Sequence, residues 1–466
     1  MFTFDRRVAT ALLVAGALFM EILDATVITT ALPIIAADFN VPAAHLSVGV
    51  SSYLVAVTIF IPISGYVADR FGARRIFMLA ISLFVIASVL CAFSYDVLTF
   101  TASRVLQGIG GALMVPVGRL VVLRDLPKER LVNAIAIITW PALGAPLLGP
   151  VIGGWIATHW GWPWIFLMNV PLGIIALIAS ALLLENYKGE ATRFDWPGFV
   201  LCGTGFGVLM AGLEMLSSLE GNWGLPVALI ISGVALLAVA VLYLLKAPSP
   251  LLTFSAMYSR TFRLTIIGGS VVRIALSSTP FLIPLMLQLG FGYSAVEAGA
   301  LLLWLFAGNL AIKPATTWLM NTFGFKRLLV ANGVAIAAGF FWLGQLDSTT
   351  PYWFLAVVLF ICGINRSIHL TVLNTINFAD IPNHQMRDAN TLSAVLMQMN
   401  RGLGITAGAL SLALASFLLG GSNSEPVAAH FLLAMDFMGV LALLSIIDSL
   451  TLPRNAGQTI LKKRSA

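Results

Sequence analysis

Apolar runs of about 20 residues recur along the whole chain, separated by short breaks that contain charged residues, proline or glycine. A helix of that length crosses a hydrocarbon core of roughly 30 Å, so each run is long enough to span a membrane. Charged residues make up 10% of the 466 residues, against roughly 25% in an ordinary soluble domain. The sequence therefore predicts an all-α polytopic membrane protein.

The runs predict 14 transmembrane helices in groups of six, two and six. The first six are 8–32, 46–68, 76–93, 98–122, 131–157 and 164–184. The remaining eight are 199–216 and 226–245, then 264–287, 298–319, 328–346, 353–372, 392–419 and 427–450. We expect an N-terminal six-helix bundle at residues 1–187, two inserted transmembrane helices at 188–255, and a C-terminal six-helix bundle with its tail at 256–466.

Lysine and arginine residues outside these runs all fall in alternate loops and at the two chain ends. The other loops contain acids such as Asp38, Asp96 and Asp347, and neither Lys nor Arg. Because short cytoplasmic loops carry the excess of basic residues, both termini are predicted to be cytoplasmic. The net charge of +6 is spread over separate loops, whereas nucleic-acid binding needs a basic patch on one face. We therefore expect no nucleic-acid partner.

A short internal repeat supports the division into two halves. Asp69-Arg-Phe-Gly-Ala-Arg-Arg75 follows the second run, and Asn321-Thr-Phe-Gly-Phe-Lys-Arg327 follows the tenth. Parallel repeats related by an axis along the membrane normal are one known transporter architecture, with the substrate held near the midplane. The repeat therefore predicts two related six-helix halves.

Four motifs resemble those of one transporter family. Gly65-Tyr-Val-Ala-Asp-Arg-Phe-Gly-Ala-Arg-Arg75 resembles the loop signature G-x-L-A-D-R-x-G-R-K of the major facilitator superfamily, and Arg104-Val-Leu-Gln-Gly-Ile-Gly-Gly-Ala112 resembles its R-x-x-Q-G-x-G-x-A element. Gly149-Pro-Val-Ile-Gly-Gly154 is similar to its antiporter motif. Leu23-Asp-Ala-Thr-Val-Ile-Thr-Thr-Ala-Leu-Pro33 is similar to the signature of the fourteen-helix drug:proton antiporters of the EmrB/QacA type, with Thr29 in place of an asparagine.

This resemblance implies a proton-coupled exporter that performs multidrug efflux by alternating access in the bacterial inner membrane. Its partners would be a small-molecule substrate, protons and the lipid bilayer, and it would use no cofactor beyond the proton gradient. We expect a monomer, with an added export partner as the alternative. The resemblance also gives Arg104 a role in proton coupling, and gives an antiporter role to Gly149, Pro150, Gly153 and Gly154.

The loop after the second run places a carboxylate at a helix end beside several cations. Glycine permits a tight turn there, and the helix end itself carries a partial charge. We therefore expect a charge latch that holds one conformation, formed by Gly65, Asp69, Arg70, Gly72 and Arg74. The alternative is a plain basic loop without a moving part.

Two acids lie inside the first run. Asp24 is about midway along it, where an ionisable residue is a functional hypothesis by default. Glu21 lies three residues earlier and shares the same helix face, so the two carboxylates would titrate as a coupled pair. Either could carry the transported proton, and the alternative is a static ion pair between one of them and Arg104.

The membrane-embedded charges of the second half are mainly cationic. Arg273, Arg366 and Arg401 lie inside its runs, with Asn400 next to Arg401. Buried cations need an anionic partner, which is either a protein carboxylate or the transported molecule. We therefore expect these residues to bind substrate, and the rival function is export of an anionic metabolite such as a carboxylate or siderophore.

Other function classes find less support in the sequence. There is no G-x-x-x-x-G-K-[ST] loop for ATP, and neither a nucleophile–base set nor a metal-ligand cluster accompanies the 5 histidines. We therefore expect neither an enzyme nor a metal site. A channel or a membrane sensor on a transporter scaffold remains as the alternative of a different class.

Overall fold

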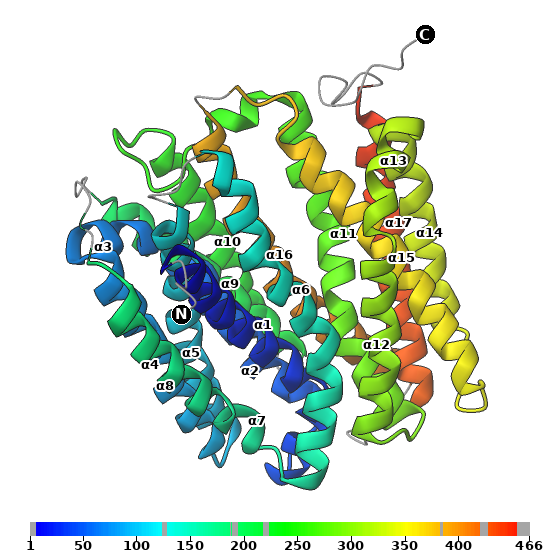
Figure 1. Cartoon of the computed structure of the whole chain (residues 1–466). Helices are drawn as coiled ribbons and strands as arrows, with labels where there is room; N and C mark the ends of the chain where they lie inside the picture. The colour runs from blue at the N-terminus through cyan, green and yellow to red at the C-terminus, as the bar shows by residue number, and fades with distance from the viewer. Residues whose placement is uncertain are drawn as a thin grey trace. The chain divides into compact units, whose positions relative to one another are not determined.

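The computed structural model describes residues 6–123, 128–186, 188, 194–217, 223–382, 385–419 and 427–453, and the side chains of 6, 7, 44, 123–143 and 387 are outside this description. The described residues form helices and no strands (Figure 1). Contacts divide the chain into two compact units, 1–207 with 294–299, and 208–293 with 300–466. The predicted segment boundaries after residues 187 and 255 follow a repeat in the sequence and stay a prediction.

The first unit contains eight helices and the start of a ninth. They are α1 Arg6–Asp38, α2 Ser47–Phe60, α3 Ile63–Phe71, α4 Ala73–Ala92, α5 Val97–Leu123, α6 Lys128–His159, α7 Trp164–Leu167, α8 Asn169–Leu183 and α9 Trp196–Ser217. A short 3-10 turn lies at Ala43–Leu46 in this unit. In the second unit, a 3-10 turn lies at Ser255–Tyr258 and a π-helical turn at Met286–Gly290.

The second unit contains the end of α9 and the remaining helices. They are α10 Gly224–Leu244, α11 Arg260–Leu285, α12 Ala295–Ala311, α13 Lys313–Phe323, α14 Phe325–Leu343, α15 Tyr352–Asn377, α16 Met386–Leu418 and α17 Ala428–Thr451. Within it α11 packs against α16 and α14 against α17, whereas in the first unit α1 packs against α6 and α4 against α5.

Eleven helices of the described part of the chain are long and apolar enough to cross a membrane, and 13 spans result if two bent pairs each count as one. The predicted run at 131–157 belongs to α6, whose side chains lie partly outside the described residues. The chain is therefore a multi-pass membrane protein, and the count of 14 stays a prediction.

Both bent spans occupy the same place in the repeat. α2 and α3 meet at 57°, and α12 and α13 meet at 50°. A proline lies at each break, Pro62 and Pro314, and removes the N–H that would continue the helix. Each pair then ends on a glycine with positive φ, Gly72 at 100° and Gly324 at 75°, which glycine adopts without steric cost. The sequence repeat is thus also a repeat of backbone geometry.

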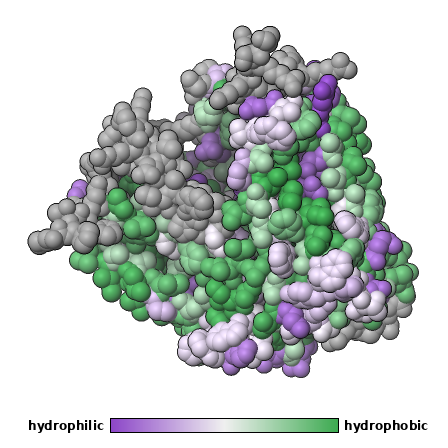
Figure 2. Space-filling model, turned by 45° about the vertical axis from the view of Figure 1, so that its right-hand side comes forward, coloured by the Kyte–Doolittle hydropathy of each residue, from purple (hydrophilic) through white to green (hydrophobic). Residues whose placement is uncertain are grey.

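Large apolar side chains remain exposed along the spans, as expected where lipid replaces water. Examples are Leu182 at 75% and Ile231 at 64% exposure. Hydrophobic residues cover much of the face shown in Figure 2. The two predicted inserted helices, α9 and α10, are the least buried spans, with 22% and 17% of their windows buried.

Candidate functional site

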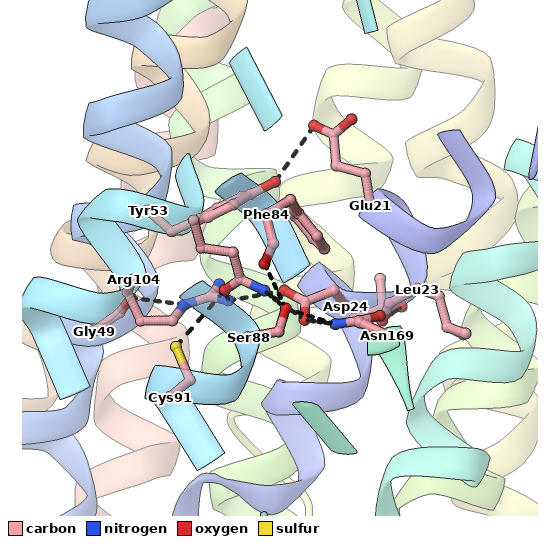
Figure 3. Close-up of polar contacts among 12 residues, drawn as sticks. Glu21, Leu23, Asp24, Gly49, Tyr53, Phe84, Ser88, Cys91, Arg104 and Asn169 are labelled. Atoms are coloured by element: carbon pink, nitrogen blue, oxygen red, sulfur yellow. Dashed lines mark hydrogen bonds and ion pairs between the residues drawn. The ribbon is translucent and has the colours of Figure 1, made fainter. Parts of the chain in front are cut away.

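Side chains and a backbone carbonyl from α1, α2, α4, α5 and α8 form a network of polar contacts in the first unit (Figure 3). Asp24 on α1 is 3% exposed and Arg104 on α5 is fully buried. Arg104 Nη1 lies 2.8 Å from Asp24 Oδ2, which makes a buried ion pair between the two helices. The predicted proton-coupling residues Asp24 and Arg104 are therefore in direct contact.

The Asp24 carboxylate accepts hydrogen bonds on both oxygens. Its Oδ1 accepts from Gln107 Nε2 at 2.9 Å and from Asn169 Nδ2 at 2.7 Å, while Oδ2 accepts from Arg104. The same Gln107 and Asn169 amides also donate to Ser88 Oγ on α4. Both oxygens of the Asp24 carboxylate are thus held by donors from α5 and α8.

Close packing of α2 against α5 completes the surroundings of Arg104. Arg104 Nε donates to the carbonyl of Gly49 at 3.2 Å, and its Cζ lies 4.4 Å from the centre of the Tyr53 ring. A Cβ on Gly108 would lie 2.5 Å from the Tyr53 carbonyl oxygen, so glycine is needed for this approach. Nη2 of Arg104 has no hydrogen-bond partner among the described residues, so the guanidinium depends on Asp24 for its counter-charge.

Glu21 lies one turn from Asp24 on α1 but has a different environment. It is partly exposed, and its Oε1 accepts a hydrogen bond from Tyr53 Oη at 3.3 Å. Tyr53 in turn stacks against Arg104. The two predicted acids are thus linked through Tyr53 and Arg104, with Glu21 the more accessible of them.

The predicted latch residues follow the chain from α3 into α4: Gly65, Asp69 and Arg70 lie in α3, Gly72 joins the two helices, and Arg74 lies in α4. Arg74 Nη2 donates to the Ala181 carbonyl at 2.7 Å, and Arg70 Nη1 donates to Tyr66 Oη at 2.5 Å. The Asp69 carboxylate forms neither a hydrogen bond nor an ion pair with the described residues. Gly72 makes the turn, whereas Gly65 has open space where a Cβ would be.

The predicted antiporter glycines lie where α6 meets α1. A Cβ on Gly149 would lie 2.0 Å from Thr26 Oγ1, and one on Gly153 would lie 2.3 Å from the Val27 carbonyl oxygen. Thr30 Oγ1 donates to the Pro150 carbonyl at 3.1 Å. Gly154 instead contacts the backbone of Ala295, in the short segment that groups with the first unit.

The predicted substrate residues lie in the second unit and form no single cluster. Arg273 on α11 is 5% exposed and donates to the Thr265 carbonyl and to Asn374. Arg366 on α15 donates to the Leu276 carbonyl, and the charge of Arg401 on α16 lies close enough to repel it. Asn400 donates to Ser270 Oγ at 2.9 Å, which ties α16 to α11.

The family model of the Major Facilitator Superfamily matches residues 14–408. The chain belongs to the major facilitator superfamily.

The sequence is similar to those of two curated relatives over nearly its full length. The chain is 34% identical over 429 residues to the probable transport protein HsrA of Haemophilus influenzae, covering 92% of this chain and 93% of that protein. It is 34% identical over 465 residues to the putative multidrug resistance protein MdtD of Pectobacterium atrosepticum, covering 97% of each.

Two solved transporter structures share the fold. A mutant form of the nucleoside transporter NupG superposes with a TM-score of 0.66 at 10% identity, over 96% of this chain and 99% of that one. A D-xylose-proton symporter also gives 0.66 at 15% identity, over 97% and 99%. These likenesses support the fold alone.

The sequence did not indicate every member of the buried polar site. Gln107 stands in the quoted R-x-x-Q-G element, three residues after Arg104, and could have been chosen from that spacing. Ser88 and Asn169 are single polar residues in apolar runs, and Tyr53 directly follows Ser51 and Ser52. Their shared role becomes visible when α1, α2, α4, α5 and α8 are placed together.

Proposed function

We propose that this protein is a proton-coupled secondary active exporter, and that multidrug efflux by alternating access is its task. It would be a fourteen-span antiporter of the EmrB/QacA type in the bacterial inner membrane, with both termini cytoplasmic. It would work as a monomer on small-molecule substrates and protons, without a cofactor. The names of the MdtD relatives support the drug-efflux part of this proposal.

The buried ion pair between Asp24 and Arg104 is the observation that carries the proposal. A charged pair inside a membrane helix bundle is costly, and such residues mark ion or proton pathways. A proton on Asp24 would cancel its charge and leave the Arg104 guanidinium without a counter-charge. Breaking a buried pair in this way costs about 3–5 kcal/mol. Proton uptake would therefore favour a second conformation in which Arg104 is better solvated.

Glu21 supplies a route by which a proton reaches this pair. Glu21 as a residue is partly exposed although its Oε2 is buried, and Tyr53 connects its Oε1 to Arg104. We assign Glu21 the role of the entry group and Asp24 that of the coupling group. The alternative is a static ion pair that only joins α1 to α5.

The test replaces Asp24 by asparagine, which keeps the shape of the side chain and removes its charge. We expect Asp24→Asn to reach the membrane in normal amount and to lose about tenfold or more of pH-gradient-driven export of ethidium from vesicles, because the proton site is gone. The matched control is Asp38→Asn at the end of the same helix, where the carboxylate accepts from Trp162 Nε1. We expect that variant to export normally.

Asp24→Asn leaves the buried Arg104 charge unpaired, so its folding is checked with a second variant. Asp24→Asn with Arg104→Gln removes both charges and should fold as well as the wild-type protein. Gradient-driven export at the normal rate by either folded variant would refute proton coupling at this site and favour the static pair.

Counterflow in proteoliposomes separates a carrier from the alternative of a channel or sensor. A preloaded unlabelled substrate should drive transient accumulation of labelled ethidium if the protein alternates between two open states. A channel dissipates the label and a sensor leaves it outside. A second candidate cargo, an anionic metabolite, is favoured by Arg273 and Arg366, which have no carboxylate partner among the described residues.

A further inference from the structure

In each half, an arginine on the fourth span contacts the first span, but the group that the first span offers to the arginine differs between the halves. In the first unit Arg104 on α5 meets the Asp24 carboxylate on α1. In the second unit Arg366 on α15 meets only a backbone carbonyl among the described residues, that of Leu276 on α11, at 2.5 Å. The second unit thus has the cation at this contact without the anion.

Proline explains how that carbonyl becomes available. Pro280 lacks the N–H that would bond to the carbonyl four residues earlier, and that carbonyl belongs to Leu276. Thr279 Oγ1 donates to it at 2.6 Å, and Arg366 Nη1 fills the place beside it. This bond holds the guanidinium in position and leaves most of its five N–H groups unused.

The structure shows no carboxylate partner for Arg366 among the described residues. Leu276 is its one hydrogen-bond partner in the described structure, and the nearby charge that acts on it is the like charge of Arg401. Arg366 is halfway along α15, Tyr352–Asn377, where an unpaired cation is costly. An anion bound at Arg366 would remove that cost.

A small cavity opens beside this group. It is lined by α11, α12, α14 and α15, and includes Leu276, Thr279, Phe340, Cys362, Asn365 and Arg366. The side-chain amide of Asn365 has no hydrogen-bond partner among the described residues, whereas the backbone carbonyl of Asn365 accepts from Asn332 Nδ2. The volume is about 20 Å³, whereas one water needs roughly 10–15 Å³ by the same measure. The cavity therefore has room for one small polar group between apolar walls.

We propose that this cavity binds the carboxylate group of an organic-acid cargo, with Arg366 as the main ligand and Asn365 as a second donor. The planar guanidinium fork matches the two oxygens of a carboxylate. The apolar wall formed by Leu276 and Phe340 disfavours a strongly hydrated inorganic ion. The inference rests on the proposed export function and names a class of cargo for it.

The test measures binding to the purified full-length protein in neutral detergent, without a gradient. The probes are sodium acetate, its neutral isostere acetamide, and sodium chloride at equal ionic strength, with calorimetric titration as the readout. We expect acetate to bind more tightly than chloride and acetamide not to bind. Arg366→Gln should weaken acetate binding by about tenfold or more, because a hydrogen-bonded charge contact is lost.

Three further variants keep the result interpretable. Arg366→Lys keeps the charge but not the fork, and should give an intermediate affinity. Asn365→Ala leaves the arginine in place and should weaken binding by a smaller factor. Arg119→Gln removes an exposed arginine from α5 of the first unit and should bind acetate within about twofold of the wild-type affinity.

The proposal is overturned if chloride or acetamide binds as tightly as acetate, or if folded Arg366→Gln or Asn365→Ala retains wild-type affinity. Because no proton gradient is present, these outcomes do not bear on proton coupling. Loss of export in Asp24→Asn with unchanged acetate binding would support both assignments separately.

Discussion

Asp24 accepts from three side chains on two helices, and each of these donors also holds a second contact. The network therefore fixes the position of the carboxylate more firmly than the ion pair alone would. The network is only partly satisfied, because Arg104 Nη2 and Asn169 Oδ1 are buried without a hydrogen-bond partner among the described residues. Asn169 is the donor from α8, and it is 1% exposed. Its contribution can be measured apart from the charge itself.

We expect Asn169→Ala to lower the free energy of unfolding by about 1.5–3 kcal/mol, because a hydrogen bond to a charged group is lost in the core. Asn400→Ala is the matched control, since that amide donates to the neutral hydroxyl of Ser270. It should cost about 1 kcal/mol. Thermal unfolding of the purified protein measures both, and equal costs would contradict the stronger contribution expected of the bond from Asn169 to Asp24.

Asp96 gives a residue-scale prediction outside the membrane spans. The Thr99 hydroxyl and then the Thr99 backbone N–H donate to its carboxylate, and they lower its pKa below the ordinary 3.8. Because the pKa of Asp96 is lower in the folded state than in the unfolded state, its hydrogen bonds stabilise the start of α5 at any pH above the unfolded pKa. This stabilisation is lost as the pH falls through the folded pKa. Amide exchange at the start of α5 should thus show constant protection from pH 7 to about pH 5.

The controls for this cap are substitutions at both partners. Asp96→Ala should speed exchange of the Thr99 amide at pH 7, and Thr99→Val should do so more weakly because the backbone bond remains. Thr99→Ser keeps the hydroxyl and should resemble the wild-type protein. Protection that is unchanged in Asp96→Ala would rule out the cap.

Helices α1 and α6 approach closely because two glycines of α6, Gly149 and Gly153, face α1. Gly149 and Gly153 have no room for a Cβ, whereas Gly144 on the same helix has open space. Membrane helices associate through such close packing, since lipid removes the usual hydrophobic drive. The antiporter motif therefore has a packing role in this structure, whatever its part in transport.

We expect Gly153→Ala to destabilise the protein by about 1–3 kcal/mol, because the new methyl group would press on the Val27 carbonyl. Gly144→Ala should be neutral or stabilising by up to about 1 kcal/mol, since alanine favours the helix. Thermal unfolding in detergent compares the two. Equal effects would mean that α1 and α6 adapt to the added volume.

At the level of helices, the positions of the prolines do not predict which helices bend. Pro62 and Pro314 lie at bends of 57° and 50°, but Pro33 and Pro116 lie inside continuous helices. The residue type is the same, and neighbouring helices decide whether the freed carbonyl opens a bend or is bonded otherwise. The apolar runs predicted the multi-pass membrane class because length and hydropathy need no partner, whereas the count of 14 spans stays a prediction.

At the scale of the molecule, the sequence predicted the membrane class and the superfamily. It selected Asp24 and Arg104 as single residues, and it offered an ion pair of Arg104 with either Glu21 or Asp24 only as an alternative. Asp24 and Arg104 each belong to a motif and each carry a charge inside an apolar run, so each can be selected from the sequence without knowledge of its partner. Tyr53 and Asn169 could not be chosen, because an uncharged polar residue in a membrane helix shows no periodicity that identifies its partner. Arg366 was noticed as a charge, but its carbonyl partner depends on the packing of α15 against α11.

The basic-residue distribution predicts which loops face the cytoplasm. Tyr95, between α4 and α5, is 78% exposed, and Tyr258, between α10 and α11, is 89% exposed. In intact cells we expect Tyr95→Cys to react with a membrane-impermeant maleimide and Tyr258→Cys to react only after permeabilisation. The native cysteines are replaced by serine in the background used. The opposite labelling pattern would invert the proposed orientation.

The ion pair of Asp24 and Arg104 also has an electrical consequence. Paired, the two groups carry no net charge, so the voltage across the membrane exerts no net force on them. On the proposed mechanism, a proton on Asp24 gives the site one positive charge, and moving one charge through roughly 100 mV changes the energy by about 2.3 kcal/mol. Loading the proton would thus make the first unit sensitive to voltage, and releasing it would make the unit insensitive again.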